Sequence, residues 1–122
     1  MDKKFFESYY RAYNREDLEA LSEFYHEDVV FRFGQGEYHG KEAFLNSLRD
    51  VFSNLKDRLS PRNIIIQGDQ AAIEIHDRLE VKQDNDNFQG QKLTKGDKFE
   101  LSVCAIYKVE GNLIKEITAY QK

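Results

Sequence analysis

Hydrophobic positions follow two different spacings along this chain, and the first predicts helices near its beginning. Between residues 5 and 25, aromatic and aliphatic side chains recur every three or four residues, which is the period of an amphipathic helix. Asn14 and Arg15 interrupt the pattern, and the acidic pair Glu16 and Asp17 suits the first turn of a second helix. We therefore expect an N-terminal helical hairpin.

A strand, a glycine-containing loop and a long helix are predicted next. Residues 29–33 are mostly β-branched and aromatic, which favours a strand, and three glycines punctuate residues 34–40. Residues 41–55 return to the helical period, with one apolar stripe. This segment is expected to be the longest helix.

The rest of the chain is predicted to form a sheet of hairpins. A short strand is expected at 63–67, after Pro61, and Gly68-Asp69 favours a tight turn. Three longer strands are expected at residues 71–81, 99–109 and 113–120. The polar segment 83–97, which contains glycine, predicts a long mobile hairpin loop. The fold class is therefore α+β with a mostly antiparallel sheet.

Length and charge narrow the function classes. A chain of 122 residues suits one packed core, so residues 1–122 are expected to form a single domain. The net charge of −4, without a basic cluster, argues against nucleic acid. The longest aliphatic run, residues 64–66, is too short to cross a membrane, and no signal peptide is recognised, so a cytoplasmic protein is expected.

Two local patterns, taken with the order of elements, resemble a known family. The first is Tyr-x-Ala-Tyr-Asn-x-x-Asp-Leu-x-Ala-Leu at residues 10–21; the second is Gly-Asp-x-Ala-Ala-Ile at 68–73 with Ala-Ile-Tyr-Lys-Val-Glu-Gly-Asn-Leu-Ile at 105–114. Together they resemble the SnoaL-like group of the nuclear transport factor 2-like superfamily, which is related to ketosteroid isomerase. The resemblance implies a strongly curved sheet, with the helical hairpin and the long helix closing a conical apolar pocket.

The family's known catalytic groups are only partly present. Aligned on ketosteroid isomerase, Tyr9 matches the oxyanion tyrosine, whereas Phe33 and Ala105 stand where the base and the second acid would be. Against limonene epoxide hydrolase, Asp77 matches one acid, while Ile75 and Ala119 stand at the other two positions. The resemblance therefore implies a small-molecule site without assigning its chemistry, because this fold carries many functions.

Asp77 is the main candidate for acid or base chemistry. Alternate strand residues share a face, and Asp77 shares the apolar face of Ile73, Ile75 and Leu79. A carboxyl group removed from water has a raised pKa unless a cation reaches it. The alternative is that Asp77 lies at the mouth of the cone, solvated or bonded to a tyrosine or to Arg32.

The sequence offers two catalytic candidates and six ligand-binding candidates. The catalytic candidates are Asp77 and Tyr9, whose hydroxyl could stabilise an oxyanion. The ligand-binding candidates are Tyr13, Phe33, Phe52, Ile75, Ala105 and Tyr107. The histidines and the single cysteine have no metal-ligand spacing, and no cofactor motif occurs, so neither a metal nor a cofactor is expected.

The sequence is compatible with two functions. The first is an isomerase, cyclase or hydrolase acting on a small apolar or aromatic molecule in the cone. The second is a non-catalytic module for ligand binding or dimerisation. A homodimer is expected through the outer face of the sheet, whose residues include Ala72, Cys104 and Ile106, because these side chains are too apolar for a fully exposed wall.

Overall fold

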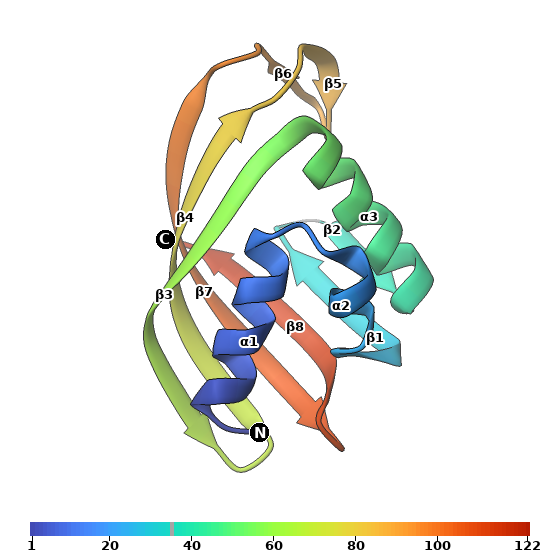
Figure 1. Cartoon of the computed structure of the whole chain (residues 1–122), viewed down its shortest axis with the longest axis vertical. Helices are drawn as coiled ribbons and strands as arrows, with labels where there is room; N and C mark the ends of the chain where they lie inside the picture. Colours follow the sequence, from blue (N-terminus) through green and yellow to red (C-terminus); the bar gives the residue numbers. More distant parts are fainter. Residues whose placement is uncertain (35) are drawn as a thin grey trace.

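A computed structural model describes residues 1–34 and 36–122 (Figure 1). Its main feature is a curved six-stranded sheet in the order β2-β1-β8-β7-β4-β3, with the helices packed against one side. Every neighbouring pair is antiparallel except β1 and β8, which run parallel. The α+β class and the curved, mostly antiparallel sheet are thus confirmed.

The helices begin where the sequence supplies capping groups. Helix α1 spans Lys3–Asn14, and the side chain of Asp2 accepts a hydrogen bond from the backbone of Phe5 at 2.9 Å. Helix α2 is short, Leu18–Ser22, and Asp17 caps it in the same way. Helix α3 spans Lys41–Asn54. The helical hairpin is present, but its second helix ends earlier than predicted because Tyr25 already begins a strand.

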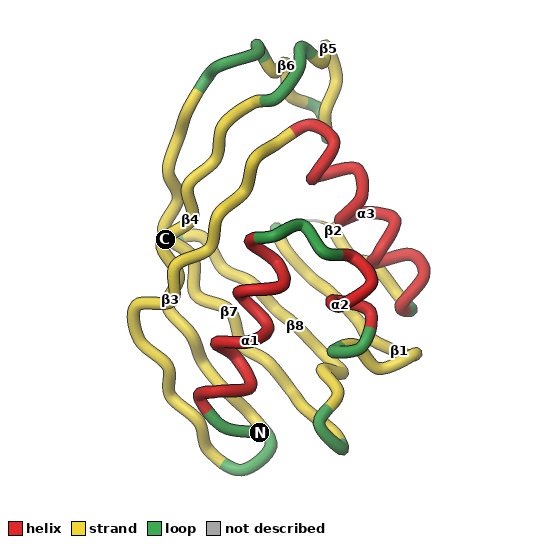
Figure 2. Tube along the Cα trace, viewed as in Figure 1, coloured by secondary structure: helices red, strands yellow, loops and turns green. Residues whose placement is uncertain are grey.

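The strands are longer and more numerous than the sequence pattern indicated. Their bounds are β1 Tyr25–Phe33, β2 Gly36–His39, β3 Leu55–Gln67, β4 Gln70–Val81, β5 Asn85–Phe88, β6 Gln91–Leu93, β7 Lys98–Glu110 and β8 Leu113–Gln121. Figure 2 shows how much of the chain the strands occupy. The expected glycine loop contains β2, which pairs with β1.

The expected loop at residues 83–97 is wrong as a description of structure. It contains the two-stranded sheet of β5 and β6, which lies beyond the ends of β4 and β7 (Figure 1). Phe88 and Leu93 are buried there, in a second apolar cluster with Leu55, Leu79 and Val81. These two apolar residues anchor a segment whose other residues are mostly polar. Its mobility stays a prediction.

Strand β3 contains the irregularity that matters for the site. It begins at Leu55, directly after α3, and runs through Pro61, where the pairing with β4 shifts between Pro61 and Asn63. Such a bulge places one extra residue in the strand and changes which side chains face inward. Asp57 is therefore buried in the first half of β3, whereas Ile65 is 58% exposed in the second half.

The core lies between the inner face of the sheet and the helices. Aromatic side chains from both layers fill it, with α1 packed over β3 and α3 over β1. Phe6, Leu21 and Tyr25 are completely buried. None of the described helices is long and apolar enough to span a bilayer.

Candidate functional site

Two aspartates lie on the inner face of adjacent strands. Asp57 on β3 is 6% exposed and Asp77 on β4 is 8% exposed, and they are the only charged residues buried among the described part of the chain. In the antiparallel register, Asp57 stands opposite Leu79 and Leu59 opposite Asp77. The two carboxyl groups are therefore diagonal neighbours on one face, close enough for their side chains to interact.

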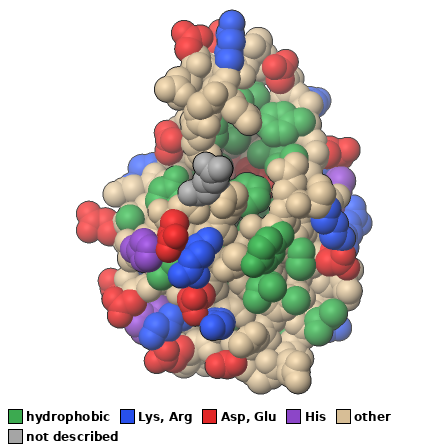
Figure 3. Space-filling model, turned by 180° about the vertical axis from the view of Figure 1, so that it is seen from behind, with side chains coloured by type: hydrophobic (Ala, Val, Ile, Leu, Met, Phe, Trp, Pro, Cys, Tyr) green, Lys and Arg blue, Asp and Glu red, His purple; other side chains and the backbone are tan. Residues whose placement is uncertain are grey.

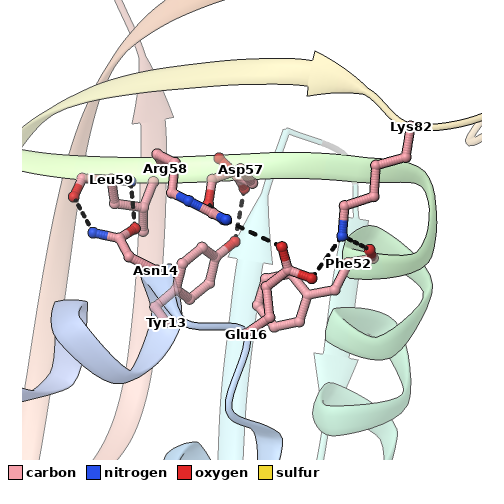
Figure 4. A network of polar contacts seen from close by, with 8 residues as sticks. All are labelled: Tyr13, Asn14, Glu16, Phe52, Asp57, Arg58, Leu59 and Lys82. Carbon is pink, nitrogen blue, oxygen red and sulfur yellow. Dashed lines mark hydrogen bonds and ion pairs between the residues drawn. The ribbon is translucent and has the colours of Figure 1, made fainter. Parts of the chain in front are cut away.

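The C-terminal end of α1 holds Asp57 in place. The side chain of Asn14 receives a hydrogen bond from the backbone N–H of Leu59 at 2.7 Å and donates one to the carbonyl of Leu59 at 2.9 Å. This clamp fixes the start of β3 against the helix (Figure 4). Beside it, the Tyr13 hydroxyl donates to Oδ2 of Asp57 at 2.7 Å. The buried Asp57 carboxyl group thus accepts one strong hydrogen bond, from the Tyr13 hydroxyl.

The basic side chains near the two aspartates bind Glu16 instead. Glu16, which follows α1, accepts from Arg58 at 3.2 Å and from Lys82 at 2.7 Å. Lys82 also donates to the Phe52 carbonyl at 2.6 Å (Figure 4). Arg58 neighbours Asp57 in the strand, but its guanidinium binds Glu16 and not the Asp57 carboxyl group (Figure 4). The described cations therefore do not neutralise the aspartate pair.

The Asp77 carboxyl group has an unusually high pKa. Burial, and then the interaction with Asp57, raises the pKa of Asp77 to about 9. Asp77 is consequently protonated at neutral pH, so that the two acids do not both carry charge. Burial, followed by the charge of Asp57, also raises the pKa of Tyr13 well above its ordinary value. The Tyr13 proton therefore stays on the hydroxyl.

The two carboxyl groups depend on each other for hydrogen bonds. Oδ1 of Asp57 and Oδ1 of Asp77 are both buried, and neither accepts a hydrogen bond from an N–H or hydroxyl group of the described residues. The protonated Asp77 can instead donate its hydrogen bond to Asp57. The proton on Asp77 therefore links the two carboxyl groups.

The predicted catalytic tyrosine lies elsewhere in the core. The Tyr9 hydroxyl is 2.8 Å from the Tyr25 hydroxyl, and Tyr10 pairs with Tyr107 at 3.0 Å. Burial raises the pKa of Tyr9 although its hydrogen bond with Tyr25 lowers it. The structure therefore brings Tyr13, rather than Tyr9, to the acid pair.

The other candidate ligand-binding residues separate into two groups. Phe52, Ile75, Ala105 and Tyr107 are buried in the core, and the rings of Phe52 and Tyr13 meet edge to face at 5.0 Å. Phe33 is different because it stands at the end of β1, where the chain turns toward β2, and it is 37% exposed. Phe33 is therefore not part of the interior.

The alternative prediction, that Asp77 bonds a tyrosine or Arg32, named the wrong partner. Arg32 lies on the other face of β1, where its guanidinium bonds Glu37 at 3.3 Å and Glu116 at 3.2 Å. Asp57 is the residue that sequence reasoning missed. Its signal was the alternation of Leu55, Asp57 and Leu59, which places the acid on an apolar face once β3 is known to begin at Leu55.

Open space occurs outside this site. One hollow of about 160 Å³ is lined by Arg62, Glu74, Ile75, His76, Ser102, Val103 and Lys122. Another of about 290 Å³ is lined by Met1, Gly68, Asp69, Val109, Gly111 and Asn112. The conical apolar pocket stays a prediction, since neither hollow includes an aspartate of the pair. Within residues 1–34 and 36–122, no three His, Cys, Asp or Glu side chains are arranged to hold a metal ion.

Comparison with known proteins identifies related folds. The family model of the SnoaL-like domain matches residues 6–117. A "putative polyketide cyclase" of Pseudomonas putida KT2440 has a TM-score of 0.82 at 23% identity, covering 97% of this chain and 89% of that one. No curated protein sequence matches the chain.

Two further solved structures show the same architecture under different names. An LEH-like epoxide hydrolase of M. tuberculosis has a TM-score of 0.79 at 17% identity, covering 98% of this chain and 80% of that one. An NTF2-like protein of unknown function from Burkholderia pseudomallei K96243 has a TM-score of 0.81 at 16% identity, covering 100% and 92%. At these identities the likeness concerns the fold alone.

Proposed function

This chain belongs to the family of SnoaL-like domains, and from that membership we propose that it binds a small, mainly apolar molecule at the inner acid pair and transfers a proton to or from it. The reaction class would be that of an isomerase, cyclase or hydrolase. The single observation that carries the proposal is Asp77, a buried carboxyl group that burial and Asp57 keep protonated at neutral pH.

The proposed chemistry assigns each residue a separate task. Asp77 holds the transferable proton, since its pKa of about 9 lies close enough to neutrality for exchange in either direction. Asp57 accepts the Tyr13 hydrogen bond and provides the negative charge that keeps the proton on Asp77. The aromatic core excludes water, which strengthens these interactions. Tyr13 acts as a positioning residue through Asp57.

A substitution at Asp77 tests this proposal. Apolar compounds with a carbonyl or an epoxide would be incubated with the protein and the products followed by mass spectrometry. Asp77→Asn keeps the shape and removes the proton, so we expect turnover to fall about 10²- to 10⁴-fold. Wild-type turnover should also decline as pH rises through about 9. Glu74→Gln, an acid on the outer face of the same strand, is the matched control.

A non-catalytic dimerisation module is the second candidate, and the outer face supports it. Ile65, Ile106 and Tyr120 are exposed there, and the register aligns Ile65 with Ala72 and then Ile106. Figure 3 shows hydrophobic side chains gathered on this face, beside a more charged region. We propose that a second copy of the chain covers these side chains, because exposed apolar surface of this kind favours association.

Solution mass measurement tests the homodimer separately from catalysis. Light scattering should give twice the chain mass at high concentration, and Ile106→Glu should give the monomer mass. A wild-type monomer at high concentration would remove this proposal. Ligand binding without turnover, unchanged by Asp77→Asn, would instead favour the non-catalytic module.

A further inference from the structure

Glu16 occupies the turn that ends α1, at a position where helices usually carry glycine. The N–H of Asp17 bonds the carbonyl of Ala12 at 3.1 Å. The N–H of Glu16 bonds the Tyr13 carbonyl at 2.9 Å, which completes a Schellman motif, and the residue at this position of the motif adopts the left-handed conformation. Glu16 accordingly has a φ of 57°, which is costly for a residue with a side chain. The turn therefore tolerates backbone strain in order to carry a glutamate.

The Glu16 side chain binds two cations near the aspartate pair. Its Oε2 accepts a hydrogen bond from Arg58 on β3 at 3.2 Å, and its Oε1 accepts one from Lys82, just after β4, at 2.7 Å (Figure 4). The Glu16 side chain is only 22% exposed, so salt and solvent screen these contacts less than contacts on the outer face. One acid thus balances cations from two strands that also carry the aspartates.

The two cations differ in what they would contact without Glu16. Lys82 has a second acceptor, the carbonyl of Phe52, at 2.6 Å. Arg58 follows Asp57 in β3, and its guanidinium already donates to the Asp57 backbone carbonyl at 3.2 Å. Without the acid, Lys82 keeps an acceptor on α3, whereas Arg58 is left beside Asp57.

We propose that Glu16 is a positioning residue, which holds the Arg58 guanidinium away from the buried acid pair and thereby keeps the shared proton in place. This inference rests on the proposed proton transfer and adds a residue that regulates it. A cation beside a carboxyl group favours the charged form of that group. A freed guanidinium would therefore draw the proton off the pair, because it would stabilise a second carboxylate there.

The described elements packed on the pair offer no other cation that opposes this effect. Helix α1 presents Tyr13, whose hydroxyl donates to Asp57 and stays protonated because burial raises its pKa. Helix α3 presents Phe52 against the Tyr13 ring, and β7 presents Leu101 opposite Asp77. Burial, and then the interaction with Asp57, raises the pKa of Asp77, and no described cation lowers it. The position of one guanidinium should therefore have a large effect on this proton.

NMR titration of the aspartate carboxyl carbons in the full chain tests the inference. In Glu16→Gln, the pKa of Asp77 should fall by about 1 or more. Adding Arg58→Gln should restore the wild-type value, whereas adding Lys82→Gln should not. Glu74→Gln, which removes an acid from the outer face of β4, is the matched control and should leave the pKa of Asp77 unchanged.

Glu16→Gly provides a second variant whose backbone suits the turn. Because glycine adopts the left-handed conformation without strain, this variant should fold and should lower the pKa of Asp77 as Glu16→Gln does. A raised wild-type pKa that stays unchanged in both variants would overturn the inference and leave the proposed proton transfer standing, as would a lowered pKa that Arg58→Gln does not restore. An ordinary pKa for Asp77 in the wild-type protein would overturn both.

Discussion

Two acids three residues apart on β4 experience opposite environments. Asp77 faces the core, where burial and the nearby Asp57 raise its pKa to about 9. Glu74 faces outward, where hydrogen bonds from Lys122 and Asn63 hold its pKa below the ordinary value. The difference shows that strand parity, more than residue type, decides which carboxyl group is suited to proton transfer.

The two faces of the sheet also differ in the partners of their polar groups. The outer face pairs its charges across strands, as Arg32 does with Glu116 and Lys108 with the same acid. These pairs are solvated, and each contributes little to stability. The inner face has few polar groups and satisfies most of them with tyrosine hydroxyls.

Truncating one isoleucine on each face of the sheet should give the largest difference in the free energy of unfolding. Ile73 is completely buried, so Ile73→Ala should lower the free energy of unfolding by about 2–5 kcal/mol. Ile65 is exposed, and Ile65→Ala in the monomer should change it by no more than about 0.5 kcal/mol. Urea denaturation of both variants measures the difference. Equal losses would contradict the assignment of inner and outer faces.

Asp77→Asn should alter how stability depends on pH. A folded-state pKa of about 9, raised from 3.8, means that folding binds a proton, so wild-type stability declines as pH rises from about 4 to 9. The decline for one such group is at most about 1.4 kcal/mol per pH unit. The variant has no proton to lose there and should show a flatter profile in urea denaturation. Parallel profiles would show that Asp77 titrates normally.

The hydroxyl of Tyr13 should matter more than that of an exposed tyrosine. Tyr13→Phe leaves Oδ2 of Asp57 without its donor, which should cost about 1–3 kcal/mol of stability. Tyr120→Phe is the matched control, because Tyr120 is exposed on β8. Thermal unfolding of the two variants at pH 7 makes the comparison. A neutral Tyr13→Phe would mean that Asp57 finds another donor.

The smallest effect is expected from the outer acid. Lys122→Gln removes the main contact of Glu74, so the pKa of Glu74 should rise toward its ordinary value while that of Asp77 stays unchanged. NMR titration of both carboxyl groups provides the measurement, and thermal stability should stay nearly constant because the pair is solvated. A change at Asp77 would show that the two faces are electrostatically linked.

The sequence predicted the order of elements but not the partner of Asp77. Alternation along β4 correctly indicated that Asp77 shares the buried face of Ile73 and Ile75. Asp57 was missed because Pro61 suggested that the preceding residues were not a strand, whereas a bulge lets β3 pass through the proline. Local patterns reveal periodicity, but a bulge depends on the neighbouring strand.

The tyrosine contacts were beyond sequence analysis for a related reason. Tyr9 and Tyr13 lie one helical turn apart on α1, so periodicity places both in the core without distinguishing them. Which of them meets an acid depends on the direction of α1 across β3, and the Asn14 contact with Leu59 sets this direction. That contact joins segments 45 residues apart in the chain.

The parallel pairing of β1 with β8 has a consequence for the order in which the protein folds. Tyr25 stands beside Ile114, so this pairing must close a loop that contains most of the chain. Closing so large a loop is entropically costly and slow compared with forming a hairpin. We therefore expect the β3-β4 and β7-β8 hairpins to form early in refolding. Strand β1, which connects the helices to the sheet, would pair with β8 last. This step would limit the refolding rate.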